Sequence, residues 1–438
     1  MTVGDCREVL AGMAPESVAA VVTDPPYHLT QVSRNGSPRQ NDPATPFGRT
    51  KLGGDRGFMG STWDGGDVAA DPATWRAVYR VMKPGAHLVA FSGTRTYHRM
   101  VCAIEDAGFE IRDQIAWIFA SGFPKSANVS KHIDRMAGVE GERIPSGLGT
   151  VRRIRPGADQ NKDGSWEKLT DRTYEHHDYE PATEAAREWE GWGTAMKPAH
   201  EPVVLARKPL SESTVAANVL RWGTGALNID AGRVEGSMDG VWGTSNTTVN
   251  RDRMFNASPA MGEYRSAPHQ KGRWPANVAH DGNDEVMAAF ARFGDKSTGN
   301  FSGHRNEPKT KDVFGAFDLQ DEKGHVGDEG SAARFFYSAK AAQWERVGSH
   351  PTVKPVALME WLVGMVAPPG GVVLDPFCGT GSTLAACDRL GFDCIGIDMQ
   401  PEAEQWCRDR IARYRARRAI GEKAPAVRSE AQMDLFGG

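Results

Sequence analysis

Two stretches of the chain, 1–123 and 333–420, alternate short apolar runs with segments of helical spacing. Strands that alternate with helices in this way predict an α/β fold with a mostly parallel sheet. The apolar runs predict strands at 19–23, 87–92, 114–120, 371–375 and 393–397. The helical spacing predicts helices at 72–82, 94–106, 354–366, 382–390 and 401–417.

Between these two stretches the hydrophobic pattern fades, and Gly, Ser, Thr, Asn and charged residues dominate. We therefore expect insertions at 124–201 and 209–332. The apolar run 202–206 separates them and predicts a strand, within 202–208, that returns to the sheet. Residues 421–438 are expected to form a C-terminal tail.

Charge and composition narrow the choice of function without deciding it. The net charge of −4 argues against a globally basic protein that coats nucleic acid, although a local basic cleft is compatible with it. No apolar run is long enough to cross a membrane, and the N-terminus lacks signal-peptide features, so we expect a cytoplasmic protein without membrane contact. Six cysteines stand singly, which argues against a structural zinc site, and no metal is expected.

The tetrapeptide Asp24-Pro25-Pro26-Tyr27 directly follows the first predicted strand. Ligands bind at the carboxyl ends of strands in open α/β sheets, and consecutive prolines fix the backbone there. The Asp24 carboxylate and the Pro25 carbonyl offer two acceptors for the hydrogens of an exocyclic amino group, which frees the nitrogen lone pair. Tyr27 is then placed to stack on a base flipped out of the duplex. The structural alternative is a polyproline turn at a strand end.

A second motif, Asp375-Pro-Phe-Cys-Gly-Thr-Gly-Ser382, lies between a predicted strand and a predicted helix. A nicotinamide dinucleotide site needs a third glycine at position 384, where this chain has Leu384, so a nicotinamide oxidoreductase is disfavoured. The two motifs together resemble motif IV and the F-x-G-x-G cofactor loop of the amino-group DNA methyltransferases, which use S-adenosylmethionine. Their order along the chain resembles the β class of this family.

The resemblance implies a three-layer, Rossmann-like methyltransferase fold that is circularly permuted, with a target-recognition region at 209–332. It implies catalytic roles for Asp24, Pro25, Pro26 and Tyr27, and base stacking by Trp117 and Phe123. It assigns cofactor binding to Asp5, His350, Thr352, Lys354, Asp375, Pro376, Phe377, Gly379, Gly381, Ser382 and Asp398. Within that set, Asp375 is expected at the methionine ammonium group, Asp398 at the ribose and Asp5 at the adenine.

The implied reaction transfers a methyl group from S-adenosylmethionine to adenine N6 in double-stranded DNA. An acidic first residue in motif IV favours adenine, and cytosine N4 stays open as the alternative product. A non-catalytic DNA-binding protein would be expected to lack Asp24 or Gly379, and both are present. The sequence leaves open an RNA substrate, a homodimer and a cognate restriction nuclease as partner.

Overall fold

The computed structural model describes most of the two predicted core stretches and part of each insertion. The described residues are 1–27, 67–120, 122, 126–152, 159–160, 166–167, 173–234, 272–294, 296–297, 329–339, 345 and 353–419. The chain forms two compact units, one made of Met1–Ala120 with His200–Gly438, and the other of Ser121–Ala199. No helix within the described ranges is long and apolar enough to cross a membrane.

The larger unit is built on a sheet with the strand order β1-β15-β14-β2-β3-β9-β4-β10-β13. Its strands are β1 (Thr2–Val3), β2 (Val18–Thr23), β3 (Met82–Phe91), β4 (Glu110–Ile118), β9 (His200–Arg207), β10 (Val278–His280), β13 (Tyr337–Ser338), β14 (Val372–Asp375) and β15 (Asp393–Asp398). Strand β9 runs antiparallel to both β3 and β4, and the other pairings of this sheet are parallel. The predicted mostly parallel α/β fold is therefore confirmed.

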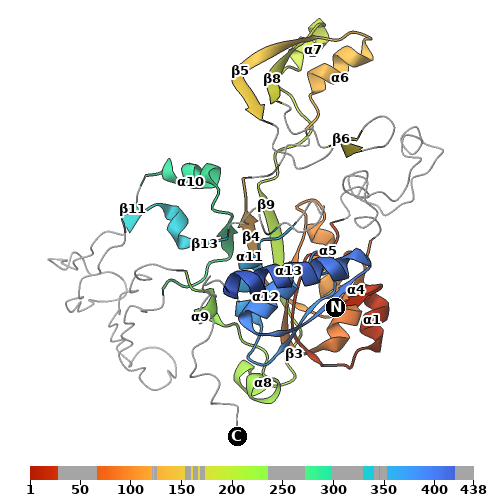
Figure 1. Ribbon diagram of the computed structural model, residues 1–438, viewed down its shortest axis with the longest axis vertical. Helices are drawn as coiled ribbons and strands as arrows, with labels where there is room; N and C mark the ends of the chain where they lie inside the picture. The colour runs from red at the N-terminus through yellow and green to blue at the C-terminus, as the bar shows by residue number, and fades with distance from the viewer. Residues whose placement is uncertain are drawn as a thin grey trace, which may run out of the picture. The chain divides into compact units, whose positions relative to one another are not determined.

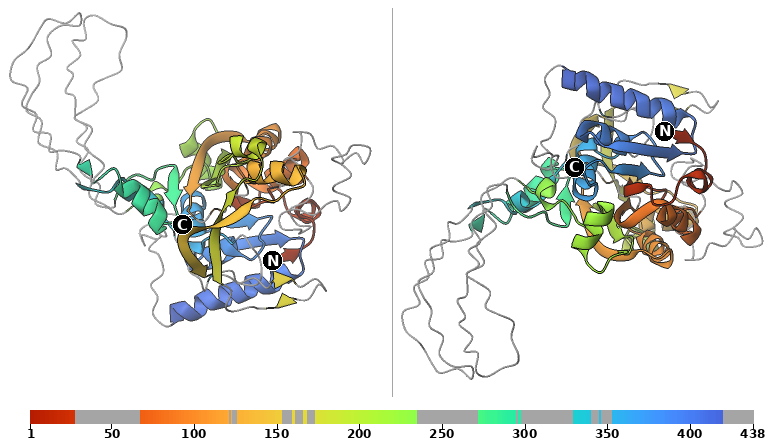
Figure 2. Two further views of the ribbon diagram at one scale, coloured as in Figure 1. Left: turned by 90° about the horizontal axis from the view of Figure 1, so that it is seen from above. Right: turned by 90° about the horizontal axis from the view of Figure 1, so that it is seen from below.

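Helices cover both faces of this sheet and make the fold three-layered (Figures 1 and 2). They are α1 (Cys6–Gly12), α4 (Pro72–Val81) and α5 (Tyr97–Asp106) on one face, and α11 (Val356–Val366), α12 (Ser382–Leu390) and α13 (Glu402–Ala419) on the other. Alternating side chains of β2 point to the two layers, because successive residues of a strand face opposite sides. Ala20 and Val22 pack in the cluster of α11 and α12, whereas Val21 packs with α1 and α4. Val18 also packs with α1 and α4, because the pairing of β2 with β3 is irregular between Val18 and Ala20.

The predicted returning strand is β9, and the sequence pattern gave its position but not its direction. A second difference lies in 209–332, which contributes β10 to the main sheet beside β4. Part of the expected insertion therefore belongs to the core. The same stretch forms α8 (Val215–Trp222), α9 (Ile229–Gly232), α10 (Asp284–Ala291), β11 (Lys296–Ser297) and β12 (Glu329–Gly330), and η3 (Ala332–Phe335) follows directly. Strands of two or three residues in a polar stretch carry no detectable periodicity, which is why β10 and β13 were not predicted.

The smaller unit, described by itself, is held by a buried carboxylate. Its elements are α6 (Val129–Met136), β5 (Glu142–Arg152), β6 (Asp159–Gln160), β7 (Trp166–Glu167), β8 (Thr173–Glu180) and α7 (Glu184–Glu188). Asp134 on α6 accepts hydrogen bonds from the Tyr179 hydroxyl, the Ala182 amide and both the amide and hydroxyl of Thr183. These bonds tie α6 to β8 and to the start of α7.

Candidate active site

The two sequence motifs meet at the carboxyl ends of the neighbouring strands β2 and β14. Strand β2 ends at Thr23 and leads into Asp24, whereas β14 ends at Asp375. The Thr23 hydroxyl donates to Asp375 Oδ1 at 2.6 Å, so the motifs are in direct contact although 352 positions separate these residues. Parallel sheets bind ligands at this edge. The two motifs therefore lie at a single site in the fold.

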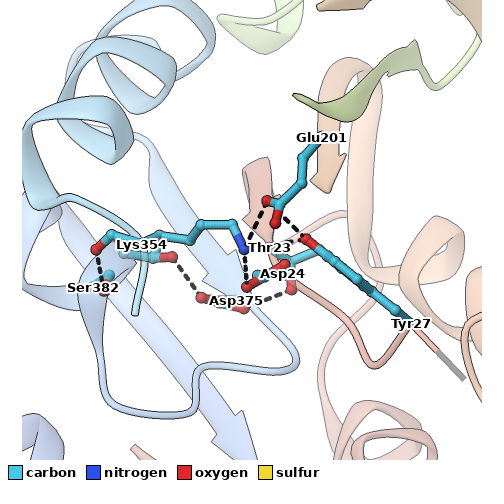
Figure 3. A network of polar contacts seen from close by, with 8 residues as sticks. Thr23, Asp24, Tyr27, Glu201, Lys354, Asp375 and Ser382 are labelled. Atoms are coloured by element: carbon cyan, nitrogen blue, oxygen red, sulfur yellow. Dashed lines mark hydrogen bonds and ion pairs between the residues drawn. The ribbon is translucent and has the colours of Figure 1, made fainter. Parts of the chain in front are cut away.

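Lys354 lies at the centre of the polar contacts around Asp24 (Figure 3). Its side chain is 6% exposed, and its Nζ lies 2.6 Å from Asp24 Oδ2 and 3.1 Å from Glu201 Oε2. Nζ also donates to the Tyr27 hydroxyl at 3.1 Å. The sequence assigned Lys354 to the cofactor, but the structure places its ammonium group against the predicted catalytic residues. Its backbone carbonyl accepts a hydrogen bond from the Ser382 hydroxyl of the cofactor loop, at 2.9 Å.

The two oxygens of Asp24 have different surroundings. Oδ2 is paired with the Lys354 ammonium. Oδ1 is buried and has no hydrogen-bond partner among the described residues. A buried carboxylate oxygen without a donor is costly in free energy, so such an atom usually has a function or an absent partner.

Glu201 is a site residue that the sequence analysis missed. It lies near the start of β9, and the antiparallel direction of β9 brings this end beside the carboxyl ends of β3 and β4. Its Oε2 accepts from the Tyr27 hydroxyl at 3.1 Å as well as from Lys354. The only signal in the sequence is an acidic residue directly before the apolar run 202–206, and its meaning depends on knowing the direction of the strand.

Burial and the mutual contacts set the protonation of this cluster. Burial lowers the pKa of Lys354, but the charges of Asp24 and Glu201 outweigh it and the net shift is upward. Burial raises the pKa of Tyr27 well above its usual range, and the same two carboxylates add to the effect. Burial also raises the pKa of Glu201, although Lys354 opposes this. At neutral pH the cluster therefore holds an ammonium and a neutral phenol.

Both oxygens of the Asp375 carboxylate, at the start of the cofactor loop, accept hydrogen bonds from the chain. The carboxylate accepts from the hydroxyls of Thr23 and Thr383 and from the Phe377 amide. Burial raises its pKa to about 7, in spite of these hydrogen bonds. The contacts explain the shape of the loop through Pro376 and Phe377, and a contact of Asp375 with a methionine ammonium stays a prediction.

The two glycines of the loop are needed for different reasons. Both have positive φ, +47° at Gly379 and +78° at Gly381, which favours glycine. A Cβ added at Gly379 meets no described atom within 4 Å, so this backbone borders open space. A Cβ added at Gly381 would lie 2.7 Å from Cys407 Sγ on α13. Gly379 therefore fits a backbone that a cofactor approaches, whereas Gly381 is required by the packing of α13.

Two further predicted cofactor residues come from neighbouring strands. Asp398 ends β15, and its Oδ2 accepts from the Gly379 amide at 2.8 Å. Strand β1 pairs with β15 so that Val3 lies opposite Asp398, and Asp5 follows two residues later. Asp5 caps α1 and forms an ion pair with Arg7. Both carboxylates thus lie at the sheet edge where the loop begins, and their roles at the ribose and the adenine stay predictions.

The predicted base-stacking residues are only partly described. Trp117 is 9% exposed and packs edge-on against Phe91, with ring centroids 6.4 Å apart. Its place in the core does not show a surface open to a base, so its stacking role stays a prediction. Phe123, His350 and Thr352 lie outside the described residues. Within the described ranges, no group of three or more His, Cys, Asp or Glu side chains is arranged to hold a metal ion.

The chain belongs to the DNA methylase family, because the family model for N6/N4 DNA methylases matches residues 18–408. This confirms the resemblance predicted from the two motifs. The chain is 41% identical over 68 residues to the Type II methyltransferase M.SmaI of Serratia marcescens. It is 39% identical over 72 residues to the Type II methyltransferase M2.DpnII of Streptococcus pneumoniae. Each alignment covers 16% of this chain, and they cover 23% and 26% of these relatives, about a quarter of their length.

Similar solved structures include the PvuII DNA methyltransferase, described as cytosine-N4-specific, with 14% identity and a TM-score of 0.38. That match covers 96% of this chain and 93% of the other. M1.HpyAVI in complex with SAM gives 14% identity and a TM-score of 0.34, over 93% of this chain and 97% of the other. Values this low do not identify a reaction, so the fold assignment depends on the strand order of the chain itself.

Proposed function

We propose that the protein transfers a methyl group from S-adenosylmethionine to the exocyclic amino group of a base in double-stranded DNA, with adenine N6 as the preferred acceptor. The observation that carries this proposal is Asp24 Oδ1, a buried acceptor without a described partner at the carboxyl end of β2. An amino group has the hydrogens that this oxygen lacks. The acidic residue at this position supports adenine, and cytosine N4 is the alternative.

The residues around Asp24 suit an amino group as the group that receives the methyl, because they offer hydrogen-bond acceptors for its hydrogens. Oδ1 accepts one hydrogen of the amino group, and the Pro25 carbonyl next to it is the candidate for the second. The phenol ring of Tyr27 offers a flat surface for a flipped base, and its hydroxyl is fixed by Glu201 and Lys354. Stabilisation in the transition state would come from positioned acceptors, in a site that excludes water.

S-Adenosylmethionine supplies an electrophilic methyl group when it is bound. The open space beside Gly379 is the observation that supports its binding here, since a Cβ at that position would point into it. Asp398 and Asp5 are proposed to hold the ribose and adenine portions, and the loop 376–382 the methionine portion. The described parts of 209–332 outside the sheet, with the remainder of that segment, are proposed to recognise the target sequence.

Identification of the methylated base tests the proposal. The full chain is incubated with S-adenosylmethionine labelled in the methyl group and with unmethylated double-stranded DNA of mixed sequence. The DNA is then digested to nucleosides and separated by chromatography. We expect labelled N6-methyladenine; labelled N4-methylcytosine would keep the mechanism and correct the base. Label that appears only in RNA offered in parallel, or in no nucleic acid, would disprove the proposed function.

A further inference from the structure

The ammonium of Lys354 forms a closed set of contacts with three side chains. It has three donor hydrogens and three acceptors within 3.1 Å: Asp24 Oδ2, Glu201 Oε2 and the Tyr27 hydroxyl. Tyr27 in turn donates to Glu201. The ammonium of Lys354 also lies over the rings of Phe91 and Tyr27, whose centroids are 5.0 Å and 5.3 Å from Nζ. Each donor hydrogen thus has a partner.

This arrangement explains why only one oxygen of Asp24 is paired. A buried ammonium with Asp24 as its only carboxylate would be free to bridge both oxygens of that group. Glu201 provides a second carboxylate on another side of Nζ and draws the ammonium away from a bridging position. Oδ1 is left without a described donor as a result.

The charges of the cluster point the same way. Methylation places positive charge on the amino nitrogen, and a lone ammonium beside Asp24 would oppose this. Asp24 Oδ2 and Glu201 Oε2 both lie within 3.1 Å of Nζ, so the positive charge of Lys354 faces two acidic side chains instead of Asp24 alone. Glu201 therefore compensates for Lys354 electrostatically as well as geometrically.

We propose that Glu201 is a positioning residue of the methyl-transfer site, which acts through Lys354 to keep one oxygen of Asp24 free and the ring of Tyr27 in place. This proposal rests on the proposed function for its effect on rate. The contacts that define it are a property of the protein without substrate, so they are open to a structural test as well.

A double-mutant cycle of Glu201→Gln and Lys354→Met tests the proposal. Glu201→Gln keeps the length of the side chain and removes its charge, and Lys354→Met keeps most of the length and removes the ammonium. Under single-turnover conditions with unmethylated double-stranded DNA, Glu201→Gln is expected to lower the rate by about 10-fold to 100-fold. Affinity for S-adenosylmethionine, measured by calorimetry, is expected to change by less than about threefold. In the Lys354→Met background, the same Glu201→Gln change is expected to alter the rate by less than about twofold.

Glu404→Gln on α13 is the matched control, because Glu404 also pairs with a basic side chain, Arg408, but at the surface. It is expected to leave the rate unchanged. An unchanged rate for Glu201→Gln, or an effect of the same size in both backgrounds, would overturn the proposal. Thermal denaturation of each variant shows whether it is folded, and Glu201→Asp, which keeps the charge, replaces Glu201→Gln if the latter does not fold.

A crystal structure of Glu201→Gln gives a second result that does not depend on activity. We expect Nζ of Lys354 within hydrogen-bond distance of both oxygens of Asp24. Nζ that stays on Oδ2 alone, with Tyr27 unmoved, would overturn the proposal. If the unsubstituted chain transfers no methyl group to DNA, the proposed function fails, while this structural result still decides whether Glu201 positions Lys354.

Discussion

Asp24 and Asp375 lie at the same edge of the sheet, at the ends of adjacent strands, but their carboxylates are used in opposite ways. Asp375 has both oxygens occupied, by two hydroxyls and one amide of its immediate surroundings. Asp24 has one oxygen held by an ammonium that comes from 330 positions away, and the other without a described partner. Donors on both oxygens fix Asp375 at the start of its loop, whereas the buried Oδ1 of Asp24 has full acceptor capacity for a ligand.

The largest effect on the rate of methyl transfer is expected from removing the carboxylate of Asp24. Replacing Asp24 with Ala removes the acceptor for the amino group, so the single-turnover rate of methyl transfer is expected to fall about 1,000-fold or more. Affinity for S-adenosylmethionine should change little, because Asp24 contacts Lys354 and not the cofactor loop. Quenched-flow measurement of labelled DNA and calorimetry with the cofactor check the two parts.

Asp24→Asn is the control that keeps the shape of the side chain. It retains one acceptor oxygen but loses the charge that holds Lys354. Its rate is expected to lie between those of Asp24→Ala and the unsubstituted chain. Methylation by Asp24→Ala at the original rate would show that Asp24 is not the hydrogen-bond acceptor for the target amino group.

A smaller effect separates the two loop glycines. Gly379→Ala and Gly381→Ala both force an L residue into a left-handed conformation, at a shared cost of about 1 kcal/mol. Gly379→Ala adds only a methyl group beside the open space, so it is expected to weaken S-adenosylmethionine binding about 10-fold. Gly381→Ala adds its methyl group 2.7 Å from Cys407 Sγ, so its main effect should be on stability.

Calorimetric titration and thermal denaturation of both variants distinguish these outcomes. The melting temperature of Gly381→Ala should lie several degrees below that of Gly379→Ala. Cofactor affinities are compared only for protein that thermal denaturation shows to be folded. Equal losses of affinity with equal melting temperatures would contradict the separate roles of the two glycines.

The sequence predicted the parts of this protein that depend on local patterns. The strands β2 and β14 are largely apolar runs, as buried parallel strands are, and the cofactor loop is a motif of neighbouring residues. Each motif directly follows a predicted strand, which is the end where open α/β sheets bind ligands. The direct contact between the two motifs, from Thr23 to Asp375, is known from the structure.

Contacts between residues far apart in the chain were not predicted from the sequence, and the assignment of Lys354 to the cofactor stays a prediction. Lys354 was assigned to the cofactor by its place in a motif, and the direction of its side chain toward Asp24 is set by packing against Phe91 and Tyr27. Glu201 was missed because its position at the site follows from the antiparallel direction of β9. The separate unit Ser121–Ala199 is held by side-chain hydrogen bonds of Asp134, which no periodic pattern reports.

The smallest expected effect concerns the pH dependence of stability at Asp375. Its pKa is raised from 3.8 to about 7, chiefly by burial, so the folded protein keeps a proton that the unfolded chain releases above pH 4. The contribution of this group is therefore fully present below the unfolded pKa and is lost as the pH rises through about 7. Asp375→Asn does not titrate, so it provides the reference.

Urea denaturation of the two proteins at pH 6 and pH 8 measures this effect. The free energy of unfolding of the unsubstituted protein, relative to Asp375→Asn, is expected to fall by about 1 kcal/mol between these pH values. Thr383→Val sharpens the test, because it removes a hydrogen bond that lowers the pKa of Asp375 and should move the decline to higher pH. A relative free energy that stays constant from pH 6 to pH 8 would mean that Asp375 is ionised throughout. Its hydrogen bonds would then outweigh its burial, and Asp375, like Asp24, would carry a full negative charge at the edge where the cofactor is proposed to bind.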